Sequence, residues 1–320
     1  MIGQQAAWRE WTEALASERM HHGWLLAGAK GLGKGDFARA AAAELVREGG
    51  PPITDVASHP DIHVLTHLPA NDDEAKKQVE GKPYQSKRNI TVDQVRAMIR
   101  RLSTKPTMGS RRAIVIDPAD DMEKSAVNAL LKALEEPPAG TFFLLVTHQP
   151  GRLLPTIRSR CRVLRFAPLS REDLDGVLRR DFPHADAALR QAAIGAAHGS
   201  PGIARAFAEH ELTGVHRLLD RILAEGDPDF RLRGALVEAM GARPSRDRQL
   251  AVLELARATL ATALPGAPSR QQAAVIEAHV ALTRLSAQAP TYNFDSGLLI
   301  LEIGGLLASA AMPRAATHPA

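Results

Sequence analysis

The sequence predicts an α/β domain followed by an all-helical region, and two observations carry this prediction. Between Trp24 and Phe166, short apolar runs alternate with helical stretches, and such alternation is typical of a parallel sheet covered by helices on both faces. After Pro168 the strand signals end, and Leu- and Ala-rich amphipathic stretches continue instead. A chain of 320 residues, 45% of them hydrophobic, is also longer than one ordinary domain needs.

The first region contains the apolar runs that we expect to be strands and the helices between them. The expected strands are residues 23–28, 62–68, 113–117, 142–147 and 163–169, and the expected helices are residues 37–46, 92–102 and 125–136. Helices placed between successive strands supply the long crossovers that parallel pairing requires.

The second region reads as helical throughout. Residues 171–180 and 186–197 form expected helices, and the second begins on a good N-cap residue, Asp186, and ends at the break Gly199-Ser200-Pro201-Gly202. Later helical stretches are separated by GDPD, GARPS, PGAPS and APTYN. The sequence therefore predicts three domains, at residues 1–167, 168–210 and 211–320.

Composition limits the classes of function. The single cysteine, Cys161, excludes an internal disulfide and a zinc site built on cysteines. The formal net charge is only +4, so nucleic acid is permitted as a partner and not demanded. No apolar run is long enough to span a membrane, and the N-terminus lacks the pattern of a signal peptide. We expect a cytoplasmic protein with no membrane partner.

The segment GAKGLGKGD at residues 28–36 comes within one residue of a phosphate-binding loop. It lies between an expected strand and an expected helix, where glycines let backbone N–H groups turn toward phosphate and the lysine reaches the terminal phosphates. The candidate nucleotide-binding residues are Gly28, Gly31, Gly33 and Lys34. The hydroxyl residue that should bind Mg²⁺ is replaced by Gly35.

An apolar strand that ends in Asp117 resembles a magnesium-holding Walker-B strand. The next residue, Pro118, cannot act as the general base that hydrolysis needs. Because the loop hydroxyl is missing as well, we expect catalysis to be disabled. For Asp117, a turn-capping role after the strand is favoured over metal binding.

Several segments together resemble one protein family. They are GAKGLGKGD, SHPD at 58–61, ITVDQVR at 90–96, AIVIDPADDM at 113–122, SAVNALLKALEEPP at 125–138 and TIRSRC at 156–161. In order and spacing they look like the δ′ family of bacterial DNA polymerase III clamp-loader subunits, over about residues 1–210; the remaining residues match only loosely.

The resemblance implies an architecture, partners and an activity. The architecture is an AAA+ parallel-sheet P-loop domain, a small helical lid and a C-terminal helical collar domain. The partners are the γ/τ motor subunits and the δ subunit in a hetero-pentameric ring, and through it the sliding clamp and primed DNA. The family implies a degenerate, vestigial P-loop and a subunit that is not an ATPase on its own but belongs to a DNA-directed DNA polymerase assembly. Because Lys34 is retained, ATP binding without hydrolysis stays open, and no cofactor is expected.

Two departures from the family pattern matter here. The four-cysteine zinc module is replaced by REGGPPITDVA before SHPD, so zinc is predicted absent. His59, His63 and His67 lie along an expected strand and are too spread for joint ligation, and no metal site is predicted. In the lid, Gly202 stands where relatives that respond to ATP carry a sensor arginine, and Arg205 reads as part of a solvated face. We do not expect the lid to respond to nucleotide.

The SRC segment keeps its chemistry, because Arg160 can serve as an arginine finger for a neighbouring ATPase subunit. From charge alone, a basic loop of Arg158, Arg160, Arg162 and Arg165 could instead contact DNA phosphates or acidic neighbours. Cys161 reads as a small buried apolar residue.

Three functional hypotheses follow. The first is a non-hydrolysing clamp-loader subunit that donates Arg160 and so supports loading of the sliding clamp during replication. The second is an AAA+ ATPase that acts on DNA in its own right, and the third is a helical DNA-binding protein.

Overall fold

The computed structural model describes residues 3–17, 19–53, 55–82, 84–289 and 294–311. The chain forms two compact units, residues 1–168 and 169–320. The first unit ends one residue beyond the predicted α/β domain. Each unit is described by itself below.

A five-stranded parallel sheet forms the centre of the first unit. Its strands are β1 (Gly23–Ala27), β2 (Ile62–Leu65), β3 (Arg112–Ile116), β4 (Thr141–Thr147) and β5 (Arg162–Arg165), in the order β2-β3-β4-β1-β5. All five expected strands are present, which confirms the predicted parallel sheet. Because β3, β4 and β1 are neighbours and run parallel, their carboxyl ends lie at the same edge of the sheet.

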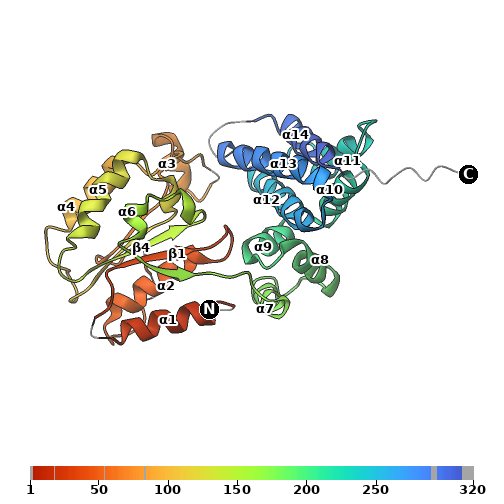
Figure 1. The fold of residues 1–320 in the computed structure, drawn as a ribbon. Helices are drawn as coiled ribbons and strands as arrows, with labels where there is room; N and C mark the ends of the chain where they lie inside the picture. Colours follow the sequence, from red (N-terminus) through yellow and green to blue (C-terminus); the bar gives the residue numbers. More distant parts are fainter. Residues whose placement is uncertain (1–2, 18, 54, 83, 290–293, 312–320) are drawn as a thin grey trace, which may run out of the picture. The chain divides into compact units, whose positions relative to one another are not determined.

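Helices cover both faces of this sheet (Figure 1). Helices α1 (Gln5–Leu15) and α2 (Lys34–Arg47) pack on one face, and α4 (Val92–Arg101) and α5 (Lys124–Glu135) pack on the other. The single-turn helix α6 (Pro155–Arg158) lies beside α5. The three expected helices of this region are therefore confirmed.

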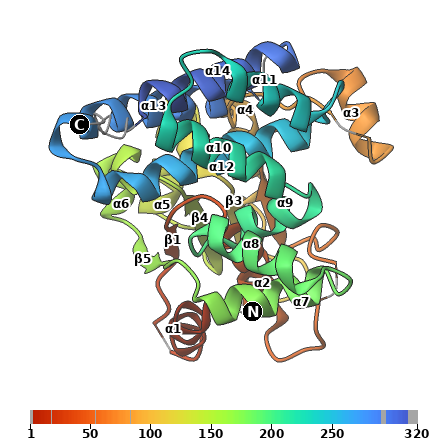
Figure 2. The same cartoon turned by 90° about the vertical axis from the view of Figure 1, so that its right-hand side faces the viewer.

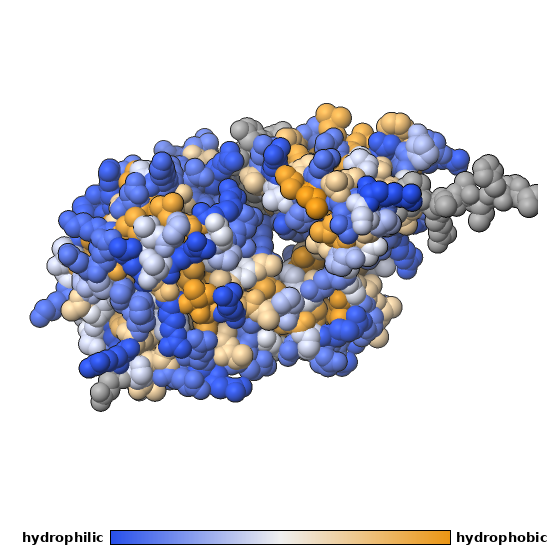
Figure 3. All heavy atoms as spheres, in the orientation of Figure 1, coloured by the Kyte–Doolittle hydropathy of each residue, from blue (hydrophilic) through white to orange (hydrophobic). Residues whose placement is uncertain are grey.

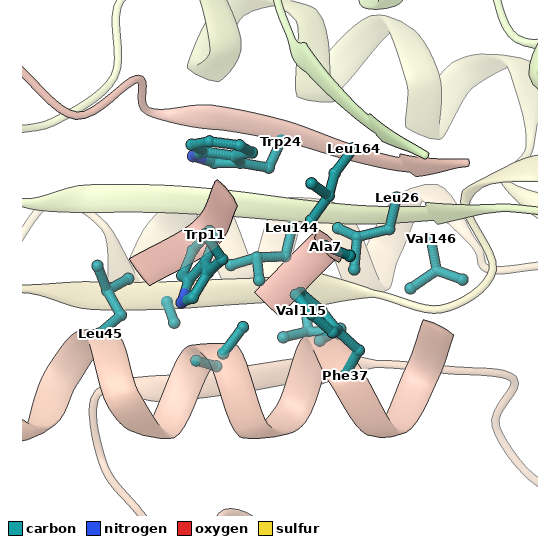
Figure 4. Close-up of a cluster of buried hydrophobic side chains, with 14 of the residues drawn as sticks. Ala7, Trp11, Trp24, Leu26, Phe37, Leu45, Val115, Leu144, Val146 and Leu164 are labelled. Atoms are coloured by element: carbon teal, nitrogen blue, oxygen red, sulfur yellow. The ribbon is translucent and has the colours of Figure 1, made fainter. Parts of the chain in front are cut away.

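Aliphatic and aromatic side chains fill the layer between α1, α2 and the sheet (Figure 4). The rings of Trp11 and Trp24 meet edge to face with centroids 5.2 Å apart, and Phe37 meets Phe166 in the same way at 5.0 Å. Burying one large apolar side chain contributes about 1.5–3 kcal/mol. This layer fixes α2, and with it the loop that precedes α2, against the sheet.

Two of the segments quoted above have structural roles. Thr91 caps α4 through a reciprocal pair of hydrogen bonds with Gln94, and the Gln94 amide also donates to the Thr66 carbonyl at 2.9 Å. The buried carboxylate of Asp61 accepts from the backbone N–H groups of Thr107 and Met108 at 2.7 and 2.8 Å. The segments ITVDQVR and SHPD therefore hold α4 and the loop after it on the sheet.

Two helices of the first unit, α1 and α3, were not expected from the sequence. Helix α3 (Asp72–Val79) has few apolar residues, and it is held by its N-cap, where Asn71 accepts from the Glu74 N–H. The partly buried Glu74 carboxylate accepts in turn from Lys77 and from the backbone N–H of Gln85. Polar contacts thus take the place of the hydrophobic pattern that predicts a helix.

The second unit is helical, which confirms the predicted change from α/β to all-α. Its helices are α7 (Arg171–Asp181), α8 (Ala187–Ala197), α9 (Pro201–Glu209), α10 (Thr213–Glu225), α11 (Arg231–Met240), α12 (Arg246–Ala263), α13 (Ser269–Gln288) and α14 (Ser296–Ser309). Short 3-10 turns occur at Ala119–Asp121, Pro150–Arg152 and Leu264–Gly266.

Within this unit, α7, α8 and α9 lie together and α10 to α14 form the remainder (Figure 2). Both α8 and α9 pack against α12. The separation of a lid at 168–210 from a collar at 211–320 therefore stays a prediction, and residues 312–320 of that collar lie outside the described part of the chain.

Polar side chains cover most of the face drawn in Figure 3, and apolar ones occur there in small groups. Among the described residues, no helix has the length and apolar character needed to cross a bilayer.

Candidate functional site

The candidate nucleotide-binding residues meet at the carboxyl edge of the sheet. Loop 28–33 follows β1, Asp117 follows β3, and Thr147 ends β4, where it pairs in register with Ala27. Open α/β sheets bind ligands at this edge. The structure thus brings the predicted residues Gly28, Gly31, Gly33, Lys34 and Asp117 to one place.

Lys34 is turned back onto its own loop. Its side chain is 2% exposed, and its ammonium donates to the carbonyl oxygens of Gly28 and Ala29 at 2.7 and 2.6 Å. Burial lowers the pKa of Lys34 to about 8, although the nearby carboxylates of Asp117 and Asp120 oppose that shift. The group that should reach phosphate is therefore engaged with the carbonyls of the loop.

Gly35 leaves room for Asp117. A Cβ atom added at Gly35 would overlap the Oδ2 atom of Asp117, so a serine or threonine cannot occupy this position while the carboxylate keeps its place. The same oxygen lies 3.4 Å from Nη1 of Arg39, which is on α2. Burial raises the pKa of Asp117, and the Arg39 charge opposes that rise.

These residues do not fit a magnesium ion. Mg²⁺ requires an octahedral set of oxygen ligands, whereas here the loop hydroxyl is absent and the guanidinium of Arg39 lies against the Asp117 carboxylate. The favoured turn-capping role of Asp117 also differs from the observed geometry, since the carboxylate pairs with Arg39 across 78 positions of sequence.

The carboxylate that does bind a turn is Asp120. It accepts from the hydroxyl of Thr147 at 2.6 Å and from the backbone N–H groups of His148 and Gln149. Sequence reasoning missed this residue, and the only available signal was its place in the DPADD segment. Asp120 fixes the end of β4 beside the phosphate loop.

His148 lies in the same corner. Burial, reinforced by the charge of Lys34, lowers the pKa of His148 to about 4. Its Nδ1 atom is buried and makes no hydrogen bond with the described part of the protein. The imidazole is therefore neutral at neutral pH.

Arg160 lies at the other edge of the sheet. It precedes β5, and Arg162, two residues later, pairs in register with Trp24 near the start of β1. The five residues of β1, at about 3.3 Å each, separate this edge from the phosphate loop by about 16 Å. Arg160 and the chain's own phosphate loop are not brought together.

The Arg160 side chain is held by its own chain. Its Nη2 atom lies 2.7 Å from Oε1 of Glu135 at the end of α5, and its Nη1 atom donates to the carbonyl of Thr156 at 2.9 Å. The side chain remains 34% exposed. Sequence reasoning missed Glu135, which belongs to the segment NALLKALEEPP.

The backbone of the SRC segment rests directly on β1. A Cβ atom at Gly23 would lie 2.8 Å from the Arg160 carbonyl oxygen and 3.2 Å from Sγ of Cys161. Cys161 packs against the core as an apolar residue but is only partly buried, so it is less buried than expected. Burial raises the pKa of its thiol to about 12.

The other arginines of the loop differ in environment. Arg162 pairs with Glu10 at 2.9 Å and lies over the Trp24 ring, while Arg158 and Arg165 are exposed. Arg160 and Arg162 thus each pair with a carboxylate of this chain, while contacts of this loop with DNA or another subunit stay a prediction.

The three histidines spaced by four have separate surroundings. His59 accepts from the Asp61 N–H at 3.2 Å, His67 lies 3.2 Å from Asp121, and His63 is on β2, where burial lowers its pKa. Among the described residues, no group of three metal-ligating side chains occurs. Whether the protein holds zinc stays a prediction.

In the second unit, Gly202 lies in the first turn of α9, which Ser200 caps. Arg205 on the same helix donates to the Asp181 carboxylate at 2.6 Å. The expected lack of response to nucleotide in the lid stays a prediction.

Sequence comparisons identify related proteins. A profile of the family described as "DNA polymerase III, delta subunit" matches residues 3–170. DNA polymerase III subunit delta′ of Pseudomonas aeruginosa is 35% identical over 178 residues, which cover 52% of this chain and 48% of that relative. The subunit of the same name from Escherichia coli is 30% identical over 221 residues, 66% of this chain and 61% of that relative.

A more distant relative is DNA polymerase III subunit tau/gamma of Haemophilus influenzae. It is 28% identical over 211 residues, which cover 62% of this chain and 28% of that relative. The chain thus spans 48% and 61% of the lengths of the two delta′ relatives.

Proposed function

Because this chain belongs to the DNA polymerase III delta-subunit family of clamp-loader proteins, we propose that it is a clamp-loader subunit that does not hydrolyse ATP. In this role it joins γ/τ-type motor subunits and a δ-type subunit in a five-membered ring. The ring loads the sliding clamp onto primed DNA in the cytoplasm, as part of the DNA polymerase assembly. The chain contributes structure and one arginine to this work.

The geometry of its own nucleotide edge supports the non-hydrolysing role. Lys34 bonds to loop carbonyls, and Arg39 lies against Asp117 where a metal ion would otherwise neutralise that carboxylate. Pro118 supplies no general base. ATP would have to displace the lysine and bring in a metal ion against the charge of Arg39, so we propose that this edge does not bind nucleotide.

The observation that carries the proposal is the position of Arg160. It lies at the edge of the sheet opposite the chain's own phosphate loop and keeps its guanidinium partly exposed. An arginine so placed can act only on a nucleotide held by another subunit. A fixed fork of N–H donors suits the charge that develops on a transferring phosphoryl group.

Reconstitution tests the proposal. The full chain should co-purify with the γ/τ-type and δ-type subunits of its own source, and the Arg160→Ala chain should do the same. Removing an arginine finger costs about 10³-fold or more at the site that depends on it, so clamp- and DNA-stimulated ATP turnover should fall by the share of that one site. Arg160→Lys should restore little, because an ammonium lacks the planar fork.

Arg158→Ala is the matched control, since Arg158 belongs to the same segment and is exposed. A ring with Arg160→Ala that hydrolyses ATP and loads clamps normally would refute the finger assignment. ATP turnover by the isolated chain would instead support an ATPase that acts in its own right.

A further inference from the structure

The contact between Glu135 and Arg160 joins two segments that are separate in sequence. Glu135 ends α5, and Arg160 follows α6. The Oε1 to Nη2 distance of 2.7 Å is that of a close ion pair. On the other side of the guanidinium, Nη1 donates to Thr156 at 2.9 Å. The arginine head is thus held at both terminal nitrogens.

The segments that carry the two partners contact the same short stretch of chain, residues 22–23. The imidazole Nε2 atom of His22 lies 2.9 Å from the carbonyl oxygen of Leu134, the residue before Glu135. Gly23, the residue after His22, lies so near the Arg160 carbonyl that an added Cβ atom would come within 2.8 Å of its oxygen. The end of α5 and the SRC segment are therefore fixed to consecutive residues at the start of β1.

From this geometry we infer that Glu135 is a positioning residue for Arg160, an inference that rests on the finger role proposed above. Glu135 and Thr156 hold the guanidinium in one orientation before the neighbouring nucleotide arrives. A guanidinium has five N–H donors, so these contacts leave donors for phosphate oxygens. Glu135 itself touches no nucleotide.

Pre-orientation matters because the arginine acts in the transition state. A long side chain that must be ordered during the reaction loses part of its effect, whereas one already held does not. The pair is half exposed, and pairs of this kind add little to folding stability. Removing Glu135 should consequently leave the fold intact and change the reaction.

The test uses the reconstituted ring and measures clamp- and DNA-stimulated ATP turnover. The part of the turnover that Arg160→Ala abolishes belongs to the dependent site. Glu135→Ala should lower that part by about tenfold, within the range that a misplaced catalytic group costs. The change should appear in kcat with KM for ATP unchanged, since only the transition state is affected.

Two variants and a double mutant separate positioning from a merely structural role. Glu135→Gln keeps an oxygen acceptor and should retain most of the activity, and Glu136→Ala, the adjacent exposed glutamate, should behave as the unmodified ring. In an Arg160→Ala ring, adding Glu135→Ala should change nothing further, because its effect passes through the arginine.

Each other outcome overturns the inference. Normal turnover with Glu135→Ala, in a preparation where Arg160→Ala is impaired, removes Glu135 and leaves the proposed function standing. Faster turnover would mean that the carboxylate competes with phosphate for the arginine. Additive losses in the double mutant, or failure of Glu135→Gln to join the ring, would mean a structural role. Normal turnover with Arg160→Ala would remove the proposed function and this inference together.

Discussion

The ammonium of Lys34 lies 2.7 Å from the carbonyl oxygen of Gly28, the first glycine of its own phosphate loop. A lysine in this position of a working site binds the terminal phosphates. Here it closes the loop on itself, and the consequence can be measured.

The isolated chain should not hydrolyse ATP. Lys34 is bonded within the loop, Gly35 offers no metal ligand, and Pro118 offers no base. Turnover by the purified protein should equal that of Lys34→Ala, measured by phosphate release. ATP with Mg²⁺ should also leave the thermal unfolding temperature unchanged. Turnover above background that disappears in Lys34→Ala would contradict the assignment.

Gly35→Ala should destabilise the first unit by less than about 1 kcal/mol, because the added methyl group meets only the end of the Asp117 side chain, which can turn away, and alanine favours the helix. The three tryptophans of the chain, Trp8, Trp11 and Trp24, all lie in this unit, so their fluorescence during urea unfolding reports on it. Gly151→Ala is the control, since a Cβ atom there meets open space. A midpoint far below that of Gly151→Ala would show that the Asp117 carboxylate cannot move aside.

Gly23→Ala should disturb the SRC segment. A Cβ atom at Gly23 would press on the backbone oxygen of Arg160, and backbone yields less readily than a flexible side chain. We expect a loss of about 1–3 kcal/mol in tryptophan-detected unfolding, together with reduced ATP turnover of the reconstituted ring. A stable variant whose ring works normally would show that the close contact does not place Arg160.

Acid should weaken the first unit through His148. The folded-state pKa is lowered to about 4, while the unfolded chain binds the proton near the ordinary value of about 6.5. Between these values the unfolded state binds more protons, so stability falls as the pH is lowered. From pH 7 to 4.5 the loss assigned to this group is about 2 kcal/mol. His148→Gln should lose that much less than the unmodified protein, and the exposed His184→Gln should not.

The purified protein should contain no zinc. The only cysteine is Cys161, whose raised pKa of about 12 disfavours the thiolate that binds metals. Elemental analysis after dialysis should give far less than one zinc per chain. Near-stoichiometric zinc would mean that histidines such as His59 and His63 had been wrongly dismissed as ligands.

The central strands β1, β3 and β4 could be predicted from sequence because nearly all of their residues are buried, so they read as continuous apolar runs. Strand β1, fully buried along its length, is such a run. Helix α3 could not be predicted in the same way, since Asn71 and Glu74 hold it by polar contacts. Hydrophobic periodicity does not register contacts of that kind.

The candidate sites were predicted as separate residues and not as pairs. Gly35 was identified as a missing hydroxyl, but the carboxylate that occupies the vacated space comes from Asp117, and its partner Arg39 is 78 positions away. Glu135 and Arg160 likewise meet only through the packing of α5 and α6 beside β1. Side-chain pairs set by tertiary packing carry no local sequence signal, so motif reading found Asp117 and Arg160 but missed their partners Arg39 and Glu135.

The opposite placement of Arg160 and the phosphate loop gives the proposed subunit a direction. In a head-to-tail assembly each contact joins unlike surfaces, and repeating one kind of contact repeats one kind of site. This chain offers an arginine at one edge of its sheet, while the other edge is closed by Lys34 and Arg39. In the proposed function, such a unit completes the site of the neighbour on one side and offers no working site to the neighbour on the other side. It would terminate the series of working sites and leave the assembly with a defined first and last member.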